Sequence, residues 1–558
     1  MIIRFHLLFS NILYFYFSLS FLLFIQLYIY IYIYKRSKFI FIIYIQLILL
    51  ICLLTVFTKK QQMFKSRPLS HLRYVSTMTN KRPQPDKLLQ DISTYIHSYE
   101  ITSPLAITTA KFCLLDTLGC GLASLNYKQV HDIINPPFPY IENGTRIPGT
   151  NLQMDPIQGS FALGTMIRWL DFNDCWLAAE WGHPSDNLGG IITTMDYCNR
   201  INNTSYTIKD VLYAMIKAHE IQGILALENS FNEVGLDHVI LVKLATCAVV
   251  SKIIGLNESQ TIEALSHAMV DGQSLRTYRH APNTGSRKSW AAGDATSRAV
   301  RLAYLVKQSN IGCIPSVLTV PKWGFYDASF RGKHFTMKQR PNFQSYVMEN
   351  ILFKISFPAE FHAQTAVEAS MIAHKQLKQL GKNHNDIKSI IIRTQDAAMR
   401  IIDKNGPLYN YADRDHCIQY MCAIPLIYGQ LTADDYMDDI ATKNPDIDLL
   451  RNKMVCVKDE QFTKDYYDPN KRSIANALLI ELNDGTILDK IVVEYPIGHK
   501  FRRDEGIPLL LKKFEGHVKQ RFGSDTLQTQ RILQLSTDEN FEKMPIDKFL
   551  DEFVIKQK

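Results

Sequence analysis

The segment from Trp169 to Asn187 holds the densest group of side chains that could take part in chemistry. Within nineteen residues it contains three of the five Trp residues of the chain, three Asp residues, Glu180 and His183. Acidic side chains on a loop are costly unless they are solvated, paired or functional. The segment therefore indicates either a catalytic loop or a loop whose Asp residues cap neighbouring helices.

A second segment, from Ser274 to Trp290, is strongly basic. It carries four permanent cations and one His, and no acidic residue lies between Asp271 and Asp294. Guanidinium and ammonium groups bind carboxylates and phosphates. A solvated basic surface is the alternative, but the interleaved Gly, Pro, Tyr and Trp residues favour a site for a polyanionic ligand. The four cations are Arg276, Arg279, Arg287 and Lys288.

Two smaller groups could complete such a site. Asp237 and His238 open an apolar helical stretch, where the His could also be a helix cap. Lys354 lies close to Glu360 and His362 where the character of the sequence changes, and sites are common at boundaries between domains. Together these groups predict acid–base chemistry on a multiply charged acid, because eliminating water beside a carboxylate needs a base, cations and an acid.

The sequence gives no reason to expect a metal or another cofactor. The ten Cys residues form no CxxC pair, which argues against the usual ligand frameworks for iron–sulfur clusters and structural zinc. A phosphate-binding Gly loop and a nucleophile elbow are also missing from the sequence. Reduced thiols in a cytosolic or matrix protein are the expected state.

A glycoside hydrolase is the alternative that the acidic segment alone would support. Asp171, Asp174 and Glu180 could supply the pair of carboxyl groups, and the three Trp side chains could be platforms for sugars. The glycoside hydrolase hypothesis leaves the basic segment without a role.

The elements that must position these residues are mostly helices. From Asp86 onward, apolar residues recur at helical spacing, and similar stretches cover about 105–124, 157–170, 209–224, 239–254, 259–271 and 289–307. Near residue 350 the pattern changes: 362–378 is helical, 388–394 is typical of a buried strand, and 477–482 with 487–495 is typical of a hairpin with an Asp-Gly turn. Helical patterns return at 505–521 and 544–555.

We therefore predict a mostly α fold with an inserted α+β domain. Both ends of the main body, 86–349 and 501–558, form the helical domain, and 350–500 forms a smaller α+β lid domain. The 473 residues of this body are enough for about two domains.

The first 85 residues differ from the rest. They contain eleven Lys and Arg residues and no acidic residue, so the whole-chain net charge of +8 leaves residues 86–558 with −3. A nucleic-acid partner is therefore not expected. Residues 5–34 and 39–58 are uncharged and long enough to span a membrane, and the protein would contact a membrane only if 1–58 are translated and retained.

A second start, at Met63, explains the amino terminus better. Residues 1–62 have the low-complexity composition that an upstream non-coding stretch shows when it is translated. Residues 63–85 are basic, Ser-bearing and free of acids, which is typical of a mitochondrial presequence, although a disordered tail would have a similar composition. The expected location is the mitochondrial matrix.

Six longer motifs span 168–174, 178–190, 288–298, 357–365, 412–420 and 495–499. They resemble the MmgE/PrpD superfamily, in order from about 86 to 558, and the likeness is to its mitochondrial fungal form. The resemblance implies the helical fold with an inserted lid, a homodimer, and no cofactor. It implies removal of water from 2-methylcitrate to give 2-methyl-cis-aconitate in propionate catabolism, with decarboxylation of cis-aconitate as the nearest rival.

The resemblance also assigns residues to roles. Asp171 and His183 are expected to form the proton-transfer centre, with His238 as a second acid or base. Cys175, a longer loop before His183, and Glu360 depart from the decarboxylase pattern and leave the base unassigned. The tricarboxylate substrate is expected to be held by Lys288, Lys354 and Tyr420, which the resemblance assigns, and by the three Arg residues of the basic segment, Arg276, Arg279 and Arg287.

Overall fold

The structure is a computed structural model, and it describes residues 81–138, 141–280, 282–524 and 526–555. All the helices and strands named below belong to one compact unit of the chain, Pro83–Lys558. The predictions for residues 1–62, and nearly all of the predicted presequence, lie outside the described residues.

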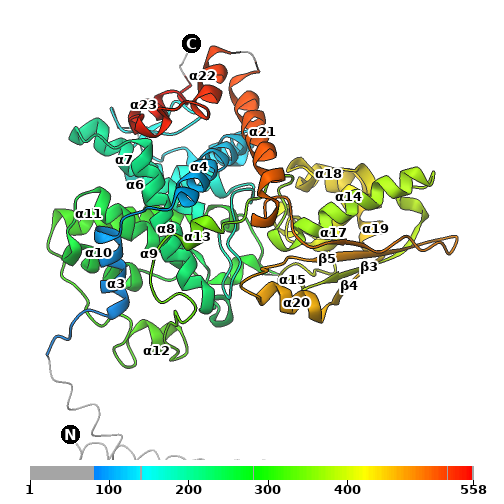
Figure 1. Cartoon of the computed structure of the whole chain (residues 1–558), viewed down its shortest axis with the longest axis horizontal. Helices are drawn as coiled ribbons and strands as arrows, with labels where there is room; N and C mark the ends of the chain where they lie inside the picture. The colour runs from blue at the N-terminus through cyan, green and yellow to red at the C-terminus, as the bar shows by residue number, and fades with distance from the viewer. Residues whose placement is uncertain (1–80, 139–140, 281, 525, 556–558) are drawn as a thin grey trace, which may run out of the picture. The chain divides into compact units, whose positions relative to one another are not determined.

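Helices dominate the first part of this unit (Figure 1). A two-stranded ribbon of β1 (Thr145–Arg146) and β2 (Gln153–Met154) is the only sheet there among the described residues. The helices are α3 (Lys87–Ser98), α4 (Pro104–Ser124), α5 (Lys128–Ile134), α6 (Pro156–Arg168), α7 (Leu188–Asn202), α8 (Ile208–Glu228), α9 (Val239–Ile253), α10 (Glu258–Val270), α11 (Arg287–Gln308), α12 (Phe325–Ser329) and α13 (Tyr346–Glu349).

The helix α4 lies in the core. Its start is fixed by Pro104 at the first helical position and by the Ser103 side chain, which accepts a hydrogen bond from the Ala106 N–H. It is the one described helix that is long and apolar enough to cross a membrane, but 72% of that apolar window is buried inside the protein. It packs against α6, α8 and α21, so its composition reflects burial on all sides.

A close contact between α6 and α11 positions two parts of the site. Gly164 and Gly293 face each other so closely that a Cβ added to Gly164 would lie 2.8 Å from the Gly293 Cα. The two helices run antiparallel at this point, since Thr296 bonds to the carbonyl of Ser160. The C-terminal end of α6, with Arg168, therefore lies beside the start of α11, with Lys288.

The second part of the unit is an α+β portion built on a four-stranded sheet of order β4-β3-β5-β6. The strands β3 and β4 are parallel, and the other two pairs are antiparallel. Its elements are α14 (Gln364–Gln379), β3 (Ile387–Thr394), α15 (Asp396–Ile401), α16 (Tyr411–Arg414), α17 (Ile418–Tyr428), α18 (Asp438–Lys443), α19 (Pro445–Arg451), β4 (Met454–Lys458), α20 (Glu460–Tyr467), β5 (Asn476–Leu482) and β6 (Ile491–Val493).

The expected hairpin is present, but its second strand is shorter than predicted. Gly485 in its turn has a φ of +86°, which a side chain would strain, and β6 covers only Ile491–Val493. The helix α14 contacts β5, β6 and α17. The mostly α fold with a smaller α+β portion is therefore as predicted.

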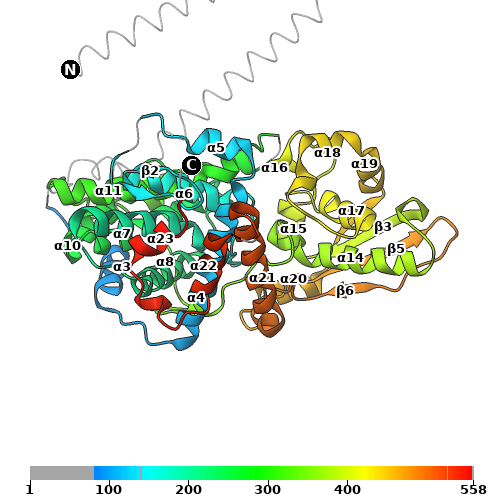
Figure 2. The same cartoon turned by 90° about the horizontal axis from the view of Figure 1, so that it is seen from above.

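The chain returns to helices after β6, with α21 (Arg503–Phe522), α22 (Leu527–Leu535) and α23 (Ile546–Asp551). The helix α21 packs on α4, and in Figures 1 and 2 it lies where the helical and the α+β portions meet. Two segments far apart in the sequence thus build the helical portion together.

Candidate active site

Asp171 is the centre of a buried cluster of charged and imidazole groups. It follows the end of α6, and its φ of +49° lies in the left-handed region that Asp and Asn tolerate better than most residues. The Arg168 guanidinium lies 2.6 Å from its carboxylate. Lys354 donates to the same carboxylate and, at 2.7 Å, to the Asp171 carbonyl oxygen.

Lys354 is held by backbone contacts on both sides of the site. Leu352 pairs with Cys175 through two backbone hydrogen bonds, and the Phe353 N–H donates to the Gly498 carbonyl oxygen at 3.0 Å. A Cβ on Gly498 would lie 1.7 Å from the Phe353 carbonyl oxygen. Only glycine therefore fits at this position of the 495–499 motif.

The two cations keep Asp171 ionised. Burial alone would raise the pKa of its carboxyl, but the Arg168 and Lys354 charges outweigh burial and hold that pKa well below its usual range. The carboxylate is therefore a fixed negative charge inside the protein.

His183 lies beside this carboxylate in a defined tautomer. Its Nδ1 is 2.6 Å from the Asp174 carbonyl oxygen, which can only accept, so the ring proton is assigned to Nδ1. Its Nε2 lies 3.8 Å from the Asp171 carboxylate. Burial, Arg168 and Lys354 hold the pKa of His183 well below its usual range, so the ring is neutral and Nε2 has a free lone pair.

Asp174 is in turn fixed from the other side. Its carboxylate accepts from the Ser185 N–H and hydroxyl, and it lies 3.0 Å from Nε2 of His219. These contacts hold the backbone carbonyl that orients His183.

His238 lies next to His183, with the two ring centroids 5.7 Å apart. Its Nδ1 is 3.2 Å from the Asp237 carboxylate, and within the described residues neither ring nitrogen makes a hydrogen bond. Burial, together with Arg279 and Arg276, holds the pKa of His238 well below its usual range despite Asp237. A second neutral imidazole is thus available beside the first.

The α+β portion supplies two further residues of the cluster, Asp415 and His416, to which the sequence analysis assigns no role. Lys288 at the start of α11 lies 2.5 Å from both carboxylate oxygens of Asp415 and 3.1 Å from Nδ1 of His416. Nε2 of His416 faces Asp171 at 3.9 Å. We call the seven residues together the Asp171 cluster: Arg168, Asp171, His183, Lys288, Lys354, Asp415 and His416. With both imidazoles neutral it carries a net charge of +1.

Two family models match this chain. The model of the MmgE/PrpD N-terminal domain matches residues 90–338, and that of the C-terminal domain matches residues 357–539. The chain belongs to the MmgE/PrpD family.

Several relatives of the MmgE/PrpD family match along nearly their whole length. A protein of Saccharomyces cerevisiae named "Probable 2-methylcitrate dehydratase" is 64% identical over 491 residues, which cover 86% of this chain and 95% of the relative. The "2-methylcitrate dehydratase, mitochondrial" of Yarrowia lipolytica is 61% identical, covering 87% and 93%. The "2-methylcitrate dehydratase" of Escherichia coli K12 is 57% identical, covering 86% and 99%.

Two of the predicted substrate-binding cations, Arg276 and Arg279, lie close to the cluster, but each already pairs with an acidic residue of the protein. Arg279 bonds to the Asp237 carboxylate, which lies beside His238. Arg276 lies 3.5 Å from Glu180 and over the Trp181 ring, 5.0 Å from its centroid. Burial raises the pKa of Glu180 to about 7, although Arg276 and Asn232 oppose the shift.

The structure does not bring the other two predicted residues into the cluster. Arg287 precedes Lys288 but points away, pairing with Asp294 at 2.8 Å and lying over Trp290, with 36% of its side chain exposed. Tyr420 is buried in α17 and donates to the Asp435 carbonyl oxygen at 2.6 Å. Tyr411 is stacked on Trp169, and its hydroxyl lies 3.4 Å from that of Ser289, the residue after Lys288.

The glycoside hydrolase alternative does not fit this geometry. Trp176 and Trp181 are 1% and 8% exposed, so neither presents a face to a sugar. Asp174 and Glu180, the other two acids of that reading, are bound to Ser185 and to Asn232.

Two groups of side chains in the described part of the chain have donor atoms close enough for a metal ion. Asp171, Asp415 and His416 form one, and Cys113, Asp174 and His219 form the other. In the first, both carboxylates already bind the ammonium groups of Lys354 and Lys288, whose charges oppose a cation. In the second, burial raises the pKa of the Cys113 thiol well above its usual range, which keeps it a thiol and a poor ligand. Neither donor set favours a metal.

Proposed function

We propose that the protein removes water from 2-methylcitrate to give 2-methyl-cis-aconitate in propionate catabolism. Three relatives that are 57–64% identical along almost their whole length carry the name of this activity. The observation that carries the proposal is the free Nε2 lone pair of His183, in a buried cluster with a net positive charge. A base beside fixed cations is what this elimination needs.

In the proposed step, Nε2 of His183 takes the proton from the carbon beside a substrate carboxylate. The electron pair of that C–H bond forms the new carbon–carbon double bond, and the C–O bond of the neighbouring hydroxyl breaks. The hydroxyl leaves as water after it takes a proton from an acid. Our candidate is His238 as the imidazolium, a form that the Asp237 carboxylate, 3.2 Å from its Nδ1, and the negative charge of the bound substrate favour; donating the proton returns the ring to its neutral form. Asp171 stabilises the imidazolium of His183, while Lys288, Lys354 and Arg168 offset the charge of the substrate carboxylates.

His416 is a second candidate for the acid. It reaches the same carboxylate from the α+β portion and contacts Asp415 and Lys288. A His416→Asn variant with a normal turnover number would leave His238 as the acid.

The test is to incubate the chelator-treated protein separately with 2-methylcitrate, citrate and cis-aconitate. We expect ultraviolet absorbance from a new double bond with 2-methylcitrate and no release of carbon dioxide from cis-aconitate. Carbon dioxide release without dehydration would favour the decarboxylase alternative instead.

We also propose that the enzyme works as a homodimer in the mitochondrial matrix. The basic, acid-free composition of residues 63–85 and the mitochondrial name of the Yarrowia lipolytica relative support this location. Fractionation of mitochondria with amino-terminal sequencing tests it, and peptides from residues 1–62 would refute the second start. Light scattering of the purified protein tests the dimer.

A further inference from the structure

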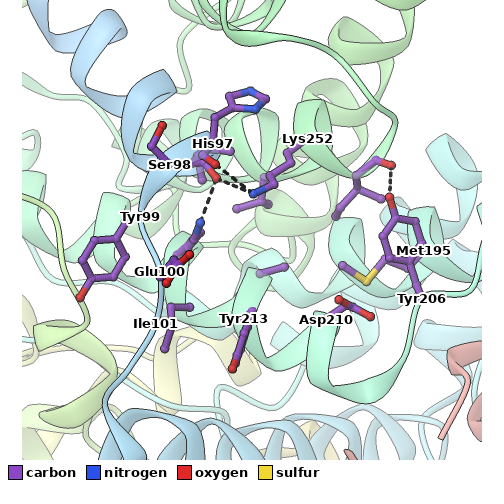
Figure 3. A pocket seen from close by; sticks show the side chains of 15 residues that line it. His97, Ser98, Tyr99, Glu100, Ile101, Met195, Tyr206, Asp210, Tyr213 and Lys252 are labelled. Atoms are coloured by element: carbon purple, nitrogen blue, oxygen red, sulfur yellow. Dashed lines mark hydrogen bonds between the residues drawn. The ribbon is translucent and has the colours of Figure 1, made fainter. Parts of the chain in front are cut away.

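A cavity of about 570 Å³ lies at the C-terminal end of α3, and none of the residues that line it belongs to the Asp171 cluster. Figure 3 shows how the chain surrounds it: His97 to Ile101 form one wall, and Asp210 and Tyr213 of α8 form the opposite one, with Met195 and Tyr206 beside them. The volume lies in the range of small-molecule sites, roughly 300–1,000 Å³.

Two ammonium groups meet at one end of this cavity. Lys217 of α8 donates to the Ile96 carbonyl oxygen at 2.9 Å, and Lys252 of α9 donates to the same oxygen at 3.1 Å. The shared acceptor keeps the two nitrogen atoms within about 6 Å of each other. A single carboxylate can span that separation with its two oxygens.

Two carboxylates, those of Glu100 and Asp210, also line the cavity, but neither pairs directly with these ammonium groups. Among the described residues, no carboxylate oxygen lies within 4.0 Å of either ammonium. The Asp210 carboxylate accepts from the N–H and hydroxyl of Thr207 at the start of α8. The carbonyls at the end of α3 supply only a partial negative charge.

Lys217 is the more buried of the two lysines. It is only 7% exposed, and burial together with the charge of Lys252 lowers its pKa to about 8. Its weak contact with the Tyr95 carbonyl, at 3.5 Å, and its bond to Ile96 use at most two of its three N–H groups. A donor therefore remains for an anion.

The rest of the cavity is mainly apolar, with Ile101, Met195, Val249, Ile253 and Tyr213 among its lining. We propose that the cavity binds a small monocarboxylate with an apolar body, whose carboxylate bridges Lys217 and Lys252. The apolar body lies against Met195 and Tyr213. A site with one charged end and apolar walls discriminates against both a bare inorganic anion and an uncharged alcohol of the same length.

Isothermal titration calorimetry with hexanoate as the probe tests this site, with hexanol and inorganic phosphate in parallel. We expect saturable binding of hexanoate and no saturable binding of the other two. Lys252→Met should weaken binding at least about tenfold, since it removes a hydrogen bond to a charged group. Lys128→Met, which removes a surface lysine paired only with Asp132, is the matched control and should bind like the wild type.

The buried lysine needs a second measurement, because Lys217→Met removes a contact of the α3 terminus as well. Acetylation of the wild-type protein, read by mass spectrometry, should modify Lys217 more slowly when hexanoate is present. Equal binding by the wild type and Lys252→Met, stronger binding of phosphate than of hexanoate, displacement of hexanoate by 2-methylcitrate, or unprotected Lys217 would each overturn the proposal.

Discussion

Replacing Asp171 by Asn isolates the charge at the centre of the cluster. Asn has nearly the same shape and tolerates the left-handed backbone that Asp171 adopts, with its φ of +49°. The substitution leaves Arg168 and Lys354 buried without their shared anion, at 2% and 0% exposure. Breaking a buried ion pair by removing one partner costs about 3–5 kcal/mol, so we expect a loss of that size in the free energy of unfolding.

Equilibrium unfolding in urea, followed by Trp fluorescence, measures this loss. The control is Asp132→Asn, which breaks the exposed pair with Lys128, whose side chains are 60% and 83% exposed. We expect a loss below about 1 kcal/mol for this control. Adding Lys354→Met to Asp171→Asn should recover part of the stability, because the unpaired ammonium is then gone. A loss for Asp171→Asn no larger than that of the control would refute the central role of this carboxylate.

Three further outcomes follow from the same geometry. Lys288→Ala should raise KM at least about tenfold and change kcat less, because a cation that holds a substrate carboxylate is removed; steady-state kinetics measures both. The folded-state pKa of His238 is depressed, so the unfolded chain binds its proton first as the pH falls through about 6.5. The contribution of His238 to the free energy of unfolding is thus lost on acidification. In urea titrations from pH 7 to 5, the free energy of unfolding should fall less for His238→Asn than for the wild type. The difference is up to about 1.4 kcal/mol per pH unit. Gly498→Ala should abolish soluble expression or turnover, because its Cβ would meet the Phe353 carbonyl oxygen, and wild-type behaviour in both assays would contradict that clash.

Local patterns predicted most of the helical framework. The stretch 105–124 became α4 (Pro104–Ser124), and the strand expected at 388–394 became β3 (Ile387–Thr394). Both have strong periodicity or a continuous apolar run between clear breaks, which is the information that local sequence carries. The last strand, β6, was predicted too long, because the residues after its turn pair with β5 only in part.

The sequence predicts the site in part, and the two missing residues of the α+β portion share one physical reason. Asp415 and His416 lie 127 and 128 residues from Lys288, their partner in space, so no local spacing relates them. The 412–420 motif contains both residues, but it predicts a role only for Tyr420. Arg168 belongs to the 168–174 motif and lies three residues before Asp171, its ion-pair partner, but the motif alone assigns it no role.

Helix geometry explains why Lys288 faces the cluster and Arg287 does not. Successive helical residues point about 100° apart, so Lys288 faces the cluster while Arg287 pairs with Asp294 near the surface. A run of cations in a sequence therefore identifies the segment of a binding site but not which of its members face inward.

The turnover number of His183→Ala with 2-methylcitrate tests the central claim most directly. His183 is the neutral imidazole whose Nε2 faces the Asp171 carboxylate, and removing a general base lowers turnover by about 10²–10⁴-fold. We predict a loss of more than about 10²-fold in kcat, with the wild-type circular dichroism spectrum retained. Near-normal turnover by this variant would contradict the assignment of His183 as the base.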